Sequence, residues 1–556
     1  MSITTPNDLF ARHQSLLEQA LSAIQTRGHW SNYAESMRGY PEAQVKSAST
    51  DFQNLCGQHF DLASVDGARQ VSGERSPYGF DLEITYNQPE PAALLAAMQS
   101  ALPQWRDIGP TARVGVCLEI LHQLNGISPL MGEAVMHTTG QGPMMAFQAG
   151  APHALDRGLE AVAYAWQSMK DIPATARWEK PQGKYDPLVM EKTFAVVPRG
   201  IALVIGCSTF PTWNSYPGMF ASLATGNPVI MKPHPGSILP AALAVKVAQE
   251  VLISAGLPPC LVSLMPDTVE APMTKTLALD PLVKVIDFTG SSAFGDWLEV
   301  NARQAEVFTE KSGVNSIIID SVSDLKAVTR NLAFTLSLYS GQMCTTTQAI
   351  FVPKAGIDTP QGKVSFAEFS EALATAINQF LSDNDRACMV LGAIQSDATA
   401  ARIDECRSLG EIVLDSEARE HPKFPQARIR TPLLLKVDAQ DQAIYSEERF
   451  GPISFLIATE NTDDSIARVR SVLTEQGAIT LGFYSTDTAR LADAEALALD
   501  VKVALSINLD GGVFVNQSAA FSDFHASGGN PAANASLTDT AFVARRFVVV
   551  QSRRHV

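Results

Sequence analysis

Residues 198–233 read PRGIALVIGCSTFPTWNSYPGMFASLATGNPVIMKP, and this stretch decides the fold. An apolar run, Ile201–Ile205, leads into a turn rich in Pro and Gly, then a helix of small residues near 220–224, then a second run, Pro228–Met231. Strand, helix and strand at this spacing predict a right-handed crossover between parallel strands. Both runs are apolar throughout rather than alternating, which is typical of a parallel sheet covered on both faces.

The same alternation continues downstream. A helix is predicted over 238–255, with Leu243, Val247 and Val251 on one stripe and Gly256 as its stop. Strands are predicted near 261–264 and 283–288. A second βα series starts at 316–320 and runs past Gly451. Because 556 residues exceed what one hydrophobic core usually organises, we expect this second series to form a separate domain.

Three segments lie outside these series. Residues 1–75 begin with a helical pattern and then become polar and irregular, so we expect an extension packed on a larger body. The mixed polar and β-branched stretch 178–197 predicts a hairpin, and 547–551 predicts a strand. Since such strands usually find a partner edge, these two segments are expected to pair with each other or with another subunit.

The composition excludes several classes of function. The chain has 46% hydrophobic residues and a net charge of −16, so we expect no nucleic-acid partner and no anionic membrane surface as partner. Seven cysteines, an odd number without CxxC pairs, predict neither a disulfide framework nor a metal site. A reducing compartment, the lack of an apolar signal segment and the lack of a long apolar run together predict cytoplasmic residence.

One cysteine stands in an unusual context. Cys344 lies in SGQMCTT (340–346), a small and polar neighbourhood that favours an accessible thiol. A thiolate is a strong nucleophile even when only a few per cent is ionised. The alternative for any single cysteine is a buried, structural side chain.

Four further motifs offer chemistry beside this thiol. Asn214 lies between prolines in FPTWNSYP, a rigid setting for an oxyanion donor just after a strand. Lys232 ends the next strand, where doubly wound sheets bind ligands. Glu310, in TEKSG, supplies a carboxylate where the chain passes between the two βα series, and Glu448, in EERFGP, supplies another beside Phe450.

The usual dinucleotide fingerprint, GxGxxG after the first strand, is absent. The segment 290–295, GSSAFG, has the spacing of a P-loop but is followed by Asp296 where a lysine is required, so a P-loop is excluded. What remains is a strand that ends near Gly290 and Ser291 and opens a helix. Its N-terminus either offers free N–H groups to a phosphate or is an ordinary βα turn.

The five segments, in this order, resemble the aldehyde dehydrogenase superfamily from about residue 90 to the end of the chain. Further motifs resemble the subgroup of phenylacetate-degradation aldehyde dehydrogenases (PaaN), a resemblance that covers essentially the whole chain. They are SPYGF (76–80), MHTTGQ (136–141), MAFQAG (145–150) and GCSTFPTWN (206–214). His137, in the second of these, is expected to be a hydrogen-bonded structural residue rather than a base.

The resemblance implies an α/β fold of the aldehyde dehydrogenase type. After the extension (1–75), a doubly wound cofactor-binding domain would span 76–177 and 198–310, and an α/β catalytic domain would span 311–537. Residues 178–197 and 538–556 would form a β oligomerisation arm, which implies a homodimer or homotetramer.

The resemblance also implies roles for individual residues. Cys344 would attack an aldehyde to give a thiohemiacetal, and Asn214 with the backbone N–H of Cys344 would hold the oxyanion. Glu310 would activate the water that hydrolyses the later thioester, a task that a moderately raised pKa would suit. The cofactor would be held by Lys232 at the adenosine ribose, by Gly290 and Ser291 near the pyrophosphate, by Glu448 and Phe450 at the nicotinamide ribose, and by Thr212 and Trp213.

The cofactor expected from the sequence is NADP, with NAD as the second choice. Members of the family that prefer NAD place a glutamate three residues after the lysine, whereas this chain reads Lys232-Pro233-His234-Pro235. Without that carboxylate nothing repels a 2'-phosphate, and Lys232 or His234 could pair with it.

The function implied is oxidation of a small-molecule aldehyde to a carboxylate, with a CoA-linked semialdehyde of aerobic phenylacetate breakdown as substrate. One alternative keeps the fold but lets CoA, not water, release the acyl group; another is a non-catalytic channelling partner with the same fold. The sequence also departs from the family: Lys311, Ser312 and Val314 replace more usual residues, and DFHASGG (523–529) replaces the common Pro-Phe-Gly-Gly segment. These departures bear on the shape of the substrate tunnel.

Overall fold

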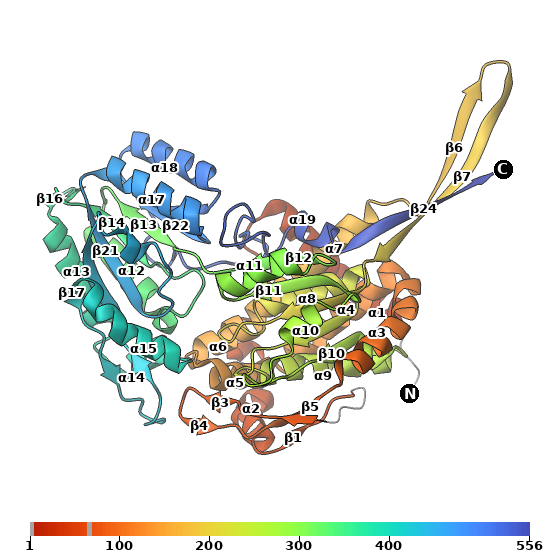
Figure 1. Ribbon diagram of the computed structural model, residues 1–556, viewed down its shortest axis with the longest axis horizontal. Helices are drawn as coiled ribbons and strands as arrows, with labels where there is room; N and C mark the ends of the chain where they lie inside the picture. The colour runs from red at the N-terminus through yellow and green to blue at the C-terminus, as the bar shows by residue number, and fades with distance from the viewer. Residues whose placement is uncertain (1–4, 64–68) are drawn as a thin grey trace.

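The computed structural model describes residues 5–63 and 69–556, which form two parallel sheets and a projecting arm (Figure 1). The first sheet has five parallel strands in the order β10-β9-β8-β11-β12. Its strands are β8 (Ile201–Ile205), β9 (Val229–Lys232), β10 (Val262–Leu264), β11 (Val283–Thr289) and β12 (Glu306–Glu310). The stretch 198–233 therefore folds as β8, α8 (Ser215–Thr225) and β9, as predicted.

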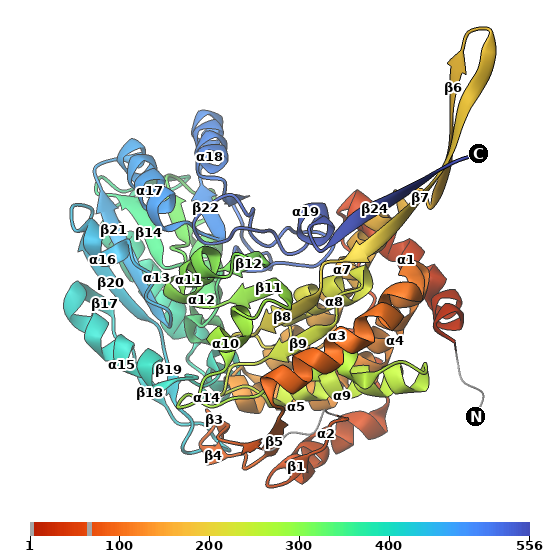
Figure 2. The same ribbon diagram turned by 45° about the vertical axis from the view of Figure 1, so that its right-hand side comes forward.

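Both faces of this sheet are covered, which explains why its strands are apolar throughout. Ile201, Leu203 and Ile205 point into a core shared with α3 (Pro91–Asp107), α10 (Thr274–Ala278) and α11 (Ser292–Asn301). Ala202 and Val204 point to the opposite core, built with α4 (Gly109–Gly126), α8 and α9 (Leu239–Ser254) (Figure 2). This arrangement confirms the predicted doubly wound α/β fold.

The second sheet has seven strands in the order β17-β20-β21-β14-β13-β22-β23, and only β17 is antiparallel to its neighbour. Helices α12 (Leu325–Ser337) and α13 (Phe366–Phe380) cover one face. Helices α15 (Asp397–Cys406), α17 (Thr462–Gln476) and α18 (Thr488–Val501) cover the other. The strands are β13 (Ser316–Ile319), β14 (Ala349–Pro353), β17 (Glu411–Leu414), β20 (Leu433–Asp438), β21 (Ile453–Thr459), β22 (Thr480–Tyr484) and β23 (Ala504–Ile507).

The N-terminal region is more ordered than its sequence indicated. Helix α1 (Pro6–Thr26) packs on α4 and α7 (Pro152–Lys170), and Leu17 and Ile24 are buried. The polar stretch that follows was expected to be irregular, but it forms α2 (Glu42–Leu55) against α5 (Ser128–Thr139). The pattern was hidden because only Ala48 and Phe52 of α2 are buried. A small sheet of β1 (His59–Phe60), β2 (Arg69–Val71) and β5 (Thr85–Gln88) completes the region.

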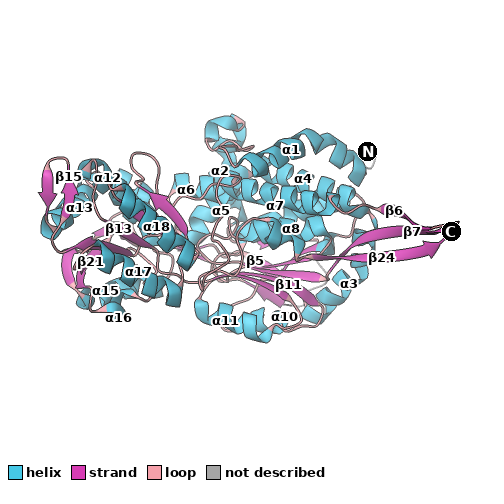
Figure 3. Cartoon of the chain, turned by 90° about the horizontal axis from the view of Figure 1, so that it is seen from above, coloured by secondary structure: helices cyan, strands magenta, loops and turns pink. Residues whose placement is uncertain are grey.

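The arm is a three-stranded antiparallel sheet that projects from the body (Figures 1 and 3). It consists of β6 (Thr175–Gln182), β7 (Tyr185–Pro198) and β24 (Phe547–His555), in the order β24-β7-β6. The hairpin and the C-terminal strand thus pair with each other, which is one of the two pairings that the sequence left open. The division of the chain into four parts remains a prediction.

The other helices and strands connect these parts. They are α6 (Pro143–Gly150), α14 (Asn384–Leu391), α16 (Gln442–Tyr445), α19 (Thr540–Ala544), β3 (Arg75–Ser76), β4 (Phe80–Asp81), β15 (Ile357–Thr359), β16 (Gly362–Val364), β18 (Ala418–Arg419) and β19 (Ile429–Arg430). In the described part of the chain, no helix has both the length and the apolar character that crossing a bilayer requires.

Candidate active site

The loop that carries Cys344 connects α12 to β14 and begins with a strained turn. Tyr339 and Ser340 both have left-handed backbone angles, with φ of 52° and 47°. Such angles cost a non-glycine residue about 1–3 kcal/mol each and persist only where the surroundings enforce them. Here the Tyr339 hydroxyl donates to the Thr139 carbonyl (2.6 Å), and the Ser340 hydroxyl donates to the Leu391 carbonyl (3.1 Å). The turn therefore fixes where the thiol emerges.

The buried side chain of Asn315 fixes the other side of this loop. Its Nδ2 donates to the carbonyl of Cys344 (2.7 Å) and to that of Thr346 (3.0 Å). Its Oδ1 accepts the backbone N–H groups of Ile479 and Thr480, both at 3.0 Å. One amide thus joins the nucleophile loop to the start of β22.

We expect Asn315→Ala to destabilise the protein by about 3 kcal/mol or more, because it leaves several buried backbone groups without partners. Urea denaturation measures this change. The control is Asn301→Ala, whose exposed amide donates only to the Trp297 carbonyl of its own helix and should shift stability by about 0.5 kcal/mol or less. A loss below about 1 kcal/mol for Asn315→Ala would contradict the role of this amide.

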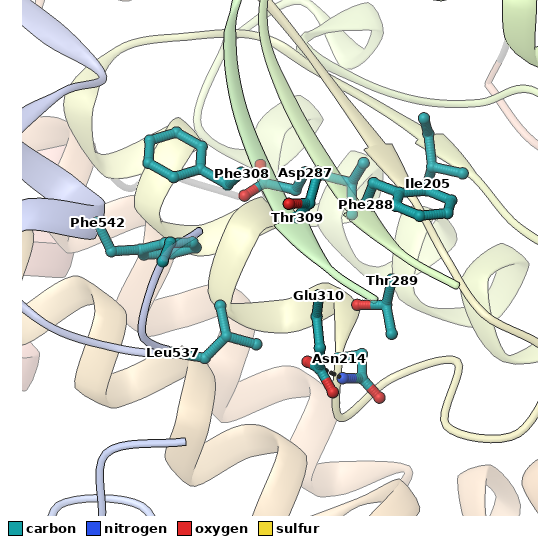
Figure 4. Close-up of a pocket in the computed structure, with 12 residues that line it drawn as sticks. Ile205, Asn214, Asp287, Phe288, Thr289, Phe308, Thr309, Glu310, Leu537 and Phe542 are labelled. Carbon is teal, nitrogen blue, oxygen red and sulfur yellow. Dashed lines mark hydrogen bonds between the residues drawn. The ribbon is translucent and has the colours of Figure 1, made fainter. Parts of the chain in front are cut away.

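Three residues predicted from the sequence, Cys344, Asn214 and Glu310, lie close together in the structure. Asn214 caps the start of α8 and Glu310 ends β12, and the Asn214 Nδ2 donates to Glu310 Oε2 at 3.0 Å (Figure 4). The Cys344 sulfur, a Glu310 carboxylate oxygen and a ring nitrogen of His525 lie within 4.8 Å of one another. Glu310 is only 4% exposed and Asn214 only 7%, whereas Cys344 is partly exposed. The site is therefore a largely buried polar cluster around the Cys344 thiol.

His525 is the member of this cluster that the sequence did not identify. Its Nε2 lies 3.1 Å from Glu310 Oε1 and 3.6 Å from the Cys344 sulfur. The one available signal was the replacement of the family's Pro-Phe-Gly-Gly segment by DFHASGG, which we interpreted only as a change in tunnel shape.

The charges in the cluster set the protonation of its acids. Burial raises the pKa of the Cys344 thiol well above its ordinary value, and the nearby Glu310 carboxylate raises it further. Burial also acts to raise the pKa of Glu310, but the positive charge of a protonated His525 and hydrogen bonds from His525, Cys344 and Asn214 outweigh it, so that pKa is lowered. The sequence-based expectation of a raised pKa for Glu310 is therefore wrong for this arrangement. Its carboxylate is ionised at neutral pH while the thiol keeps its proton.

A cavity lies beside this cluster at the carboxyl ends of β8, β11 and β12. It has about 360 Å³ of empty space, and its lining includes Ile205, Asn214, Phe288, Thr289, Glu310 and Leu537 (Figure 4). This edge is where open α/β sheets bind their ligands. A small molecule in the cavity would meet the Asn214 amide and the Glu310 carboxylate directly.

Lys232 differs from what the sequence led us to expect. Its ammonium nitrogen is buried, donates to the Pro233 carbonyl (2.7 Å) and lies 2.7 Å from Asp267 Oδ1. We expected no carboxylate beside this lysine, and Asp267 corrects that expectation. The physical reason is strand pairing: β9 and β10 are parallel neighbours, so the residues that follow them lie side by side. His234 is exposed, and its Nδ1 accepts the backbone N–H of Gly236 (3.1 Å).

The turn at Gly290 and Ser291, which the sequence predicts near the pyrophosphate, leads into α11. Ser291 is the exposed N-cap of α11, and its side chain makes no capping hydrogen bond, so the first N–H groups of the helix are open to a ligand. A Cβ at Gly290 would come within 2.7 Å of the Phe288 ring, so a larger residue there would have to displace that ring.

Glu448 and Phe450 line a second cavity of about 240 Å³, together with Gly341 and Met343 of the nucleophile loop. Burial raises the pKa of Glu448, although hydrogen bonds from Ser312 and Gly313 oppose this. The cavity places a carboxylate close to Cys344, where it could accept hydrogen bonds from ribose hydroxyls.

Thr212 and Trp213 remain predicted cofactor residues, and each has a partner within the protein. The Thr212 hydroxyl donates to the Gly150 carbonyl at 2.8 Å. The Trp213 ring meets the His525 ring edge-on, with 4.6 Å between centroids. The Arg157 guanidinium lies over the same Trp213 ring, 5.0 Å from its centroid. These side chains form the wall behind the catalytic cluster.

Comparisons with known proteins show which proteins share this fold. A crystal structure of an NAD-dependent aldehyde dehydrogenase from Burkholderia multivorans is 53% identical, covers 99% of both chains and superposes with a TM-score of 0.97. A 1-pyrroline-5-carboxylate dehydrogenase of Thermus thermophilus, 18% identical, shares the fold over 95% of this chain and 99% of its own, with a TM-score of 0.74.

Curated relatives match over shorter stretches. Aldehyde dehydrogenase family 7 member B4 of Arabidopsis thaliana is 25% identical over 287 residues, 50% of this chain and 53% of the relative. The 4-trimethylaminobutyraldehyde dehydrogenase B of Danio rerio is 26% identical over 280 residues, 49% of this chain and 51% of the relative. The chain thus spans about half the length of these relatives. The family model described as "Aldehyde dehydrogenase family" matches residues 85–503, and the chain belongs to that family.

Proposed function

We propose that this protein oxidises an aldehyde to a carboxylate with a nicotinamide dinucleotide as the oxidant. The observation that supports this most is the convergence of the Cys344 thiol, the Asn214 amide and the Glu310 carboxylate beside one cavity. A nucleophile, an oxyanion donor and a base within reach of one another are what acyl transfer through a thioester requires.

In the first half of this reaction the Cys344 thiolate adds to the carbonyl carbon of the aldehyde. The charge that develops on oxygen is held by the Cys344 backbone N–H and by the Asn214 amide, which has a second N–H beyond the one given to Glu310. As the carbonyl re-forms, the carbon gives up a hydride, leaving a thioester on Cys344. The nicotinamide, when bound, supplies the acceptor for that hydride.

In the second half, Glu310 takes a proton from water and the resulting hydroxide adds to the thioester. The thiolate then leaves, and the carboxylate product is released. The residues that we propose to hold the cofactor are Lys232 at the adenosine ribose, the turn at Gly290 and Ser291 at the phosphates, and Glu448 at the nicotinamide ribose.

Two observations favour NAD over the NADP that the sequence led us to expect. The Lys232 ammonium is already neutralised by Asp267 at 2.7 Å, so it brings no free positive charge to a 2'-phosphate. The Burkholderia multivorans relative, at 53% identity, is described as NAD-dependent. We therefore propose NAD as the preferred cofactor, with Asp267 as the residue that discourages NADP.

We expect Asp267→Asn to shift the ratio of kcat/KM for NAD over that for NADP by about ten- to a hundredfold toward NADP, because one like charge is removed and Lys232 is released. Steady-state kinetics and the Kd of each cofactor measure the shift. Asp61→Asn, at an exposed carboxylate, is the matched control. A ratio that stays within about threefold of the wild type would contradict the role of Asp267.

For the substrate we propose a CoA-linked semialdehyde of phenylacetate degradation, supported by the PaaN-like motifs at 76–80, 136–141, 145–150 and 206–214. The test is a spectrophotometric assay of the purified protein with NAD or NADP, comparing such a semialdehyde with simple aldehydes. Product analysis with and without free CoA separates hydrolysis from CoA acylation. A cofactor reduction rate equal to that of Cys344→Ala with every aldehyde would instead support the channelling role.

We also propose that the arm joins subunits into a homodimer or homotetramer. Its strand β24 is an edge strand with the exposed apolar side chains Val548 and Val550. An exposed apolar edge of this kind is normally covered by another chain.

We expect the double variant Val548→Asp, Val550→Asp to reduce the assembly to smaller units, as measured by light scattering. Ile253→Asp, at an exposed apolar residue of α9, should leave the mass unchanged; an unchanged mass for the arm variant would contradict the proposal.

A further inference from the structure

We propose that His525 is a further catalytic residue, whose Nε2–H donates a hydrogen bond to the Cys344 sulfur in its thiolate form while Glu310 orients the ring. This inference rests on the proposed role of Cys344 as the nucleophile. It assigns a chemical task to the segment DFHASGG, whose histidine replaces a residue type that cannot donate from a side chain.

The position of Nε2 between the Glu310 carboxylate and the Cys344 sulfur shows whether this nitrogen carries a hydrogen. It lies 3.1 Å from Glu310 Oε1 and 3.6 Å from the Cys344 sulfur, and the side chain is only 2% exposed. An ionised carboxylate can only accept hydrogen bonds, so Nε2 must carry a hydrogen to lie this close to it. That same hydrogen is within reach of the sulfur. Nε2 is therefore a donor whether or not the ring is charged.

The other ring nitrogen leads to the same conclusion. Nδ1 is buried and has no hydrogen-bond partner among the described residues. A buried N–H without an acceptor is costly, so in the neutral ring the hydrogen belongs on Nε2. The Trp213 ring, edge-on at 4.6 Å, restricts rotation of the imidazole. A histidine kept only for packing would gain from a partner at both nitrogens, whereas here the polar contacts are all on the side of the sulfur.

The loop that carries His525 is held on the same framework as Glu310. The backbone of His525 pairs with that of Leu537 through two hydrogen bonds of 3.1 and 2.9 Å. The fully buried Arg157 donates to the Leu537 carbonyl at 3.0 Å and to the Asp523 carbonyl at 3.1 Å. The residue after Glu310, Lys311, donates its backbone N–H to a carbonyl of this loop at 2.6 Å. The imidazole and the carboxylate are thus positioned relative to each other by the backbone.

The charges around the thiol show why such a donor is needed. The titratable groups that face Cys344 are Glu310 from β12, Cys207 from the turn after β8, Glu448 from the loop before β21, and His525. The first three are acids, and each adds to the rise in the pKa of the Cys344 thiol that burial causes. Of these four groups, His525 alone can stabilise a negative sulfur.

The proton transfer then balances within the cluster. The S–H proton of Cys344 passes to the Glu310 carboxylate, giving a thiolate and a carboxylic acid, and nothing is oxidised or reduced. The Nε2–H of His525 turns from Glu310, which no longer carries a charge, to the sulfur, which now does. When the thiolate adds to a carbonyl, its charge moves to oxygen. Glu310 returns its proton to solvent, and its carboxylate regains the hydrogen bond from His525.

The test measures the reactivity of the thiol without any aldehyde or cofactor. The rate of alkylation of Cys344 by iodoacetamide is followed by mass spectrometry from about pH 6 to about pH 10 for the wild type, His525→Ala and His525→Gln. We expect alkylation of His525→Ala near neutral pH to be about ten- to a hundredfold slower, with the apparent pKa of the thiol raised by about one to two units. Glutamine keeps an N–H donor, so His525→Gln should lie between the two. Added imidazole should restore part of the rate to His525→Ala.

The controls separate this role from a structural one. His153→Gln removes a half-exposed histidine that pairs with Glu35 and should react as the wild type does. Thermal unfolding shows whether each variant is folded, and His525→Gln keeps the test decisive if His525→Ala does not fold. Alkylation of folded His525→Gln and His525→Ala within about twofold of the wild type at every pH would overturn the proposal. A wild type that alkylates as expected but oxidises no aldehyde would contradict only the proposed function.

Discussion

Replacement of Cys344 by alanine is expected to lower kcat for aldehyde oxidation by at least about 1000-fold. The reason is that its sulfur lies within 4.8 Å of a Glu310 carboxylate oxygen and of a His525 ring nitrogen, so the change removes the proposed nucleophile from the cluster. Steady-state production of NADH measures the loss. The Kd for the cofactor should change little, because the residues proposed to hold it lie on other loops.

The matched control is Cys260→Ala, whose thiol donates to the Ala97 carbonyl of α3 at 3.8 Å. It should retain nearly full activity. Cys207 is unsuitable as a control because its thiol donates to Asn214 Oδ1 at 3.6 Å. If Cys344→Ala kept more than about a tenth of the wild-type kcat, the covalent mechanism would have to be abandoned.

Glu310→Gln is expected to lower steady-state kcat by about 100- to 10,000-fold while leaving a burst of NADH close to one equivalent per site. The thiol, whose pKa the lost carboxylate no longer raises, can then give its proton to solvent instead of to Glu310. Hydride transfer comes before hydrolysis, so an enzyme without its base should stop at the thioester on Cys344. Glutamine can still accept from the Asn214 amide and from His525, so the geometry of the cluster should persist. Stopped-flow absorbance measures the burst, and mass spectrometry of the stopped reaction detects the acylated cysteine.

The same variant makes a separate prediction about pH. The Glu310 carboxylate contributes to the raised pKa of the Cys344 thiol, so its neutralisation should lower that pKa and move the onset of alkylation to lower pH. Glu299→Gln, at a partly exposed carboxylate that pairs with Lys311, is the matched control. A fall in turnover without accumulation of the acylated cysteine would contradict the assignment of Glu310 to the water step.

Local patterns in the sequence were enough to predict much of the fold. The apolar runs of β8 and β9, the spacing of α9 and the mixed polar and β-branched residues of β6 and β7 are all properties of short segments, and each was recognised as a strand or helix. Helix α2 was missed because its pattern depends on only two buried side chains. Amphipathicity is visible in a sequence only when enough positions of a helix take part in it.

Cys344, Asn214 and Glu310 could also be proposed from the sequence, since each lies in a short motif whose residue types indicate its chemistry. Asp267 and His525 could not. Asp267 meets Lys232 only because β9 and β10 are neighbours in the sheet, and His525 meets Glu310 across a separation of 215 residues.

The sequence by itself determined which segments become strands and helices and which side chains can attack, donate or accept. The tertiary structure alone decided which charge faces which: it neutralised Lys232, lowered the pKa of Glu310 and brought an imidazole to the nucleophile. The physical reason is the separation along the chain over which each effect acts. Backbone preference and burial periodicity act over a few residues, whereas electrostatic and hydrogen-bond partners are chosen by strand order and loop path, which no short window of sequence contains.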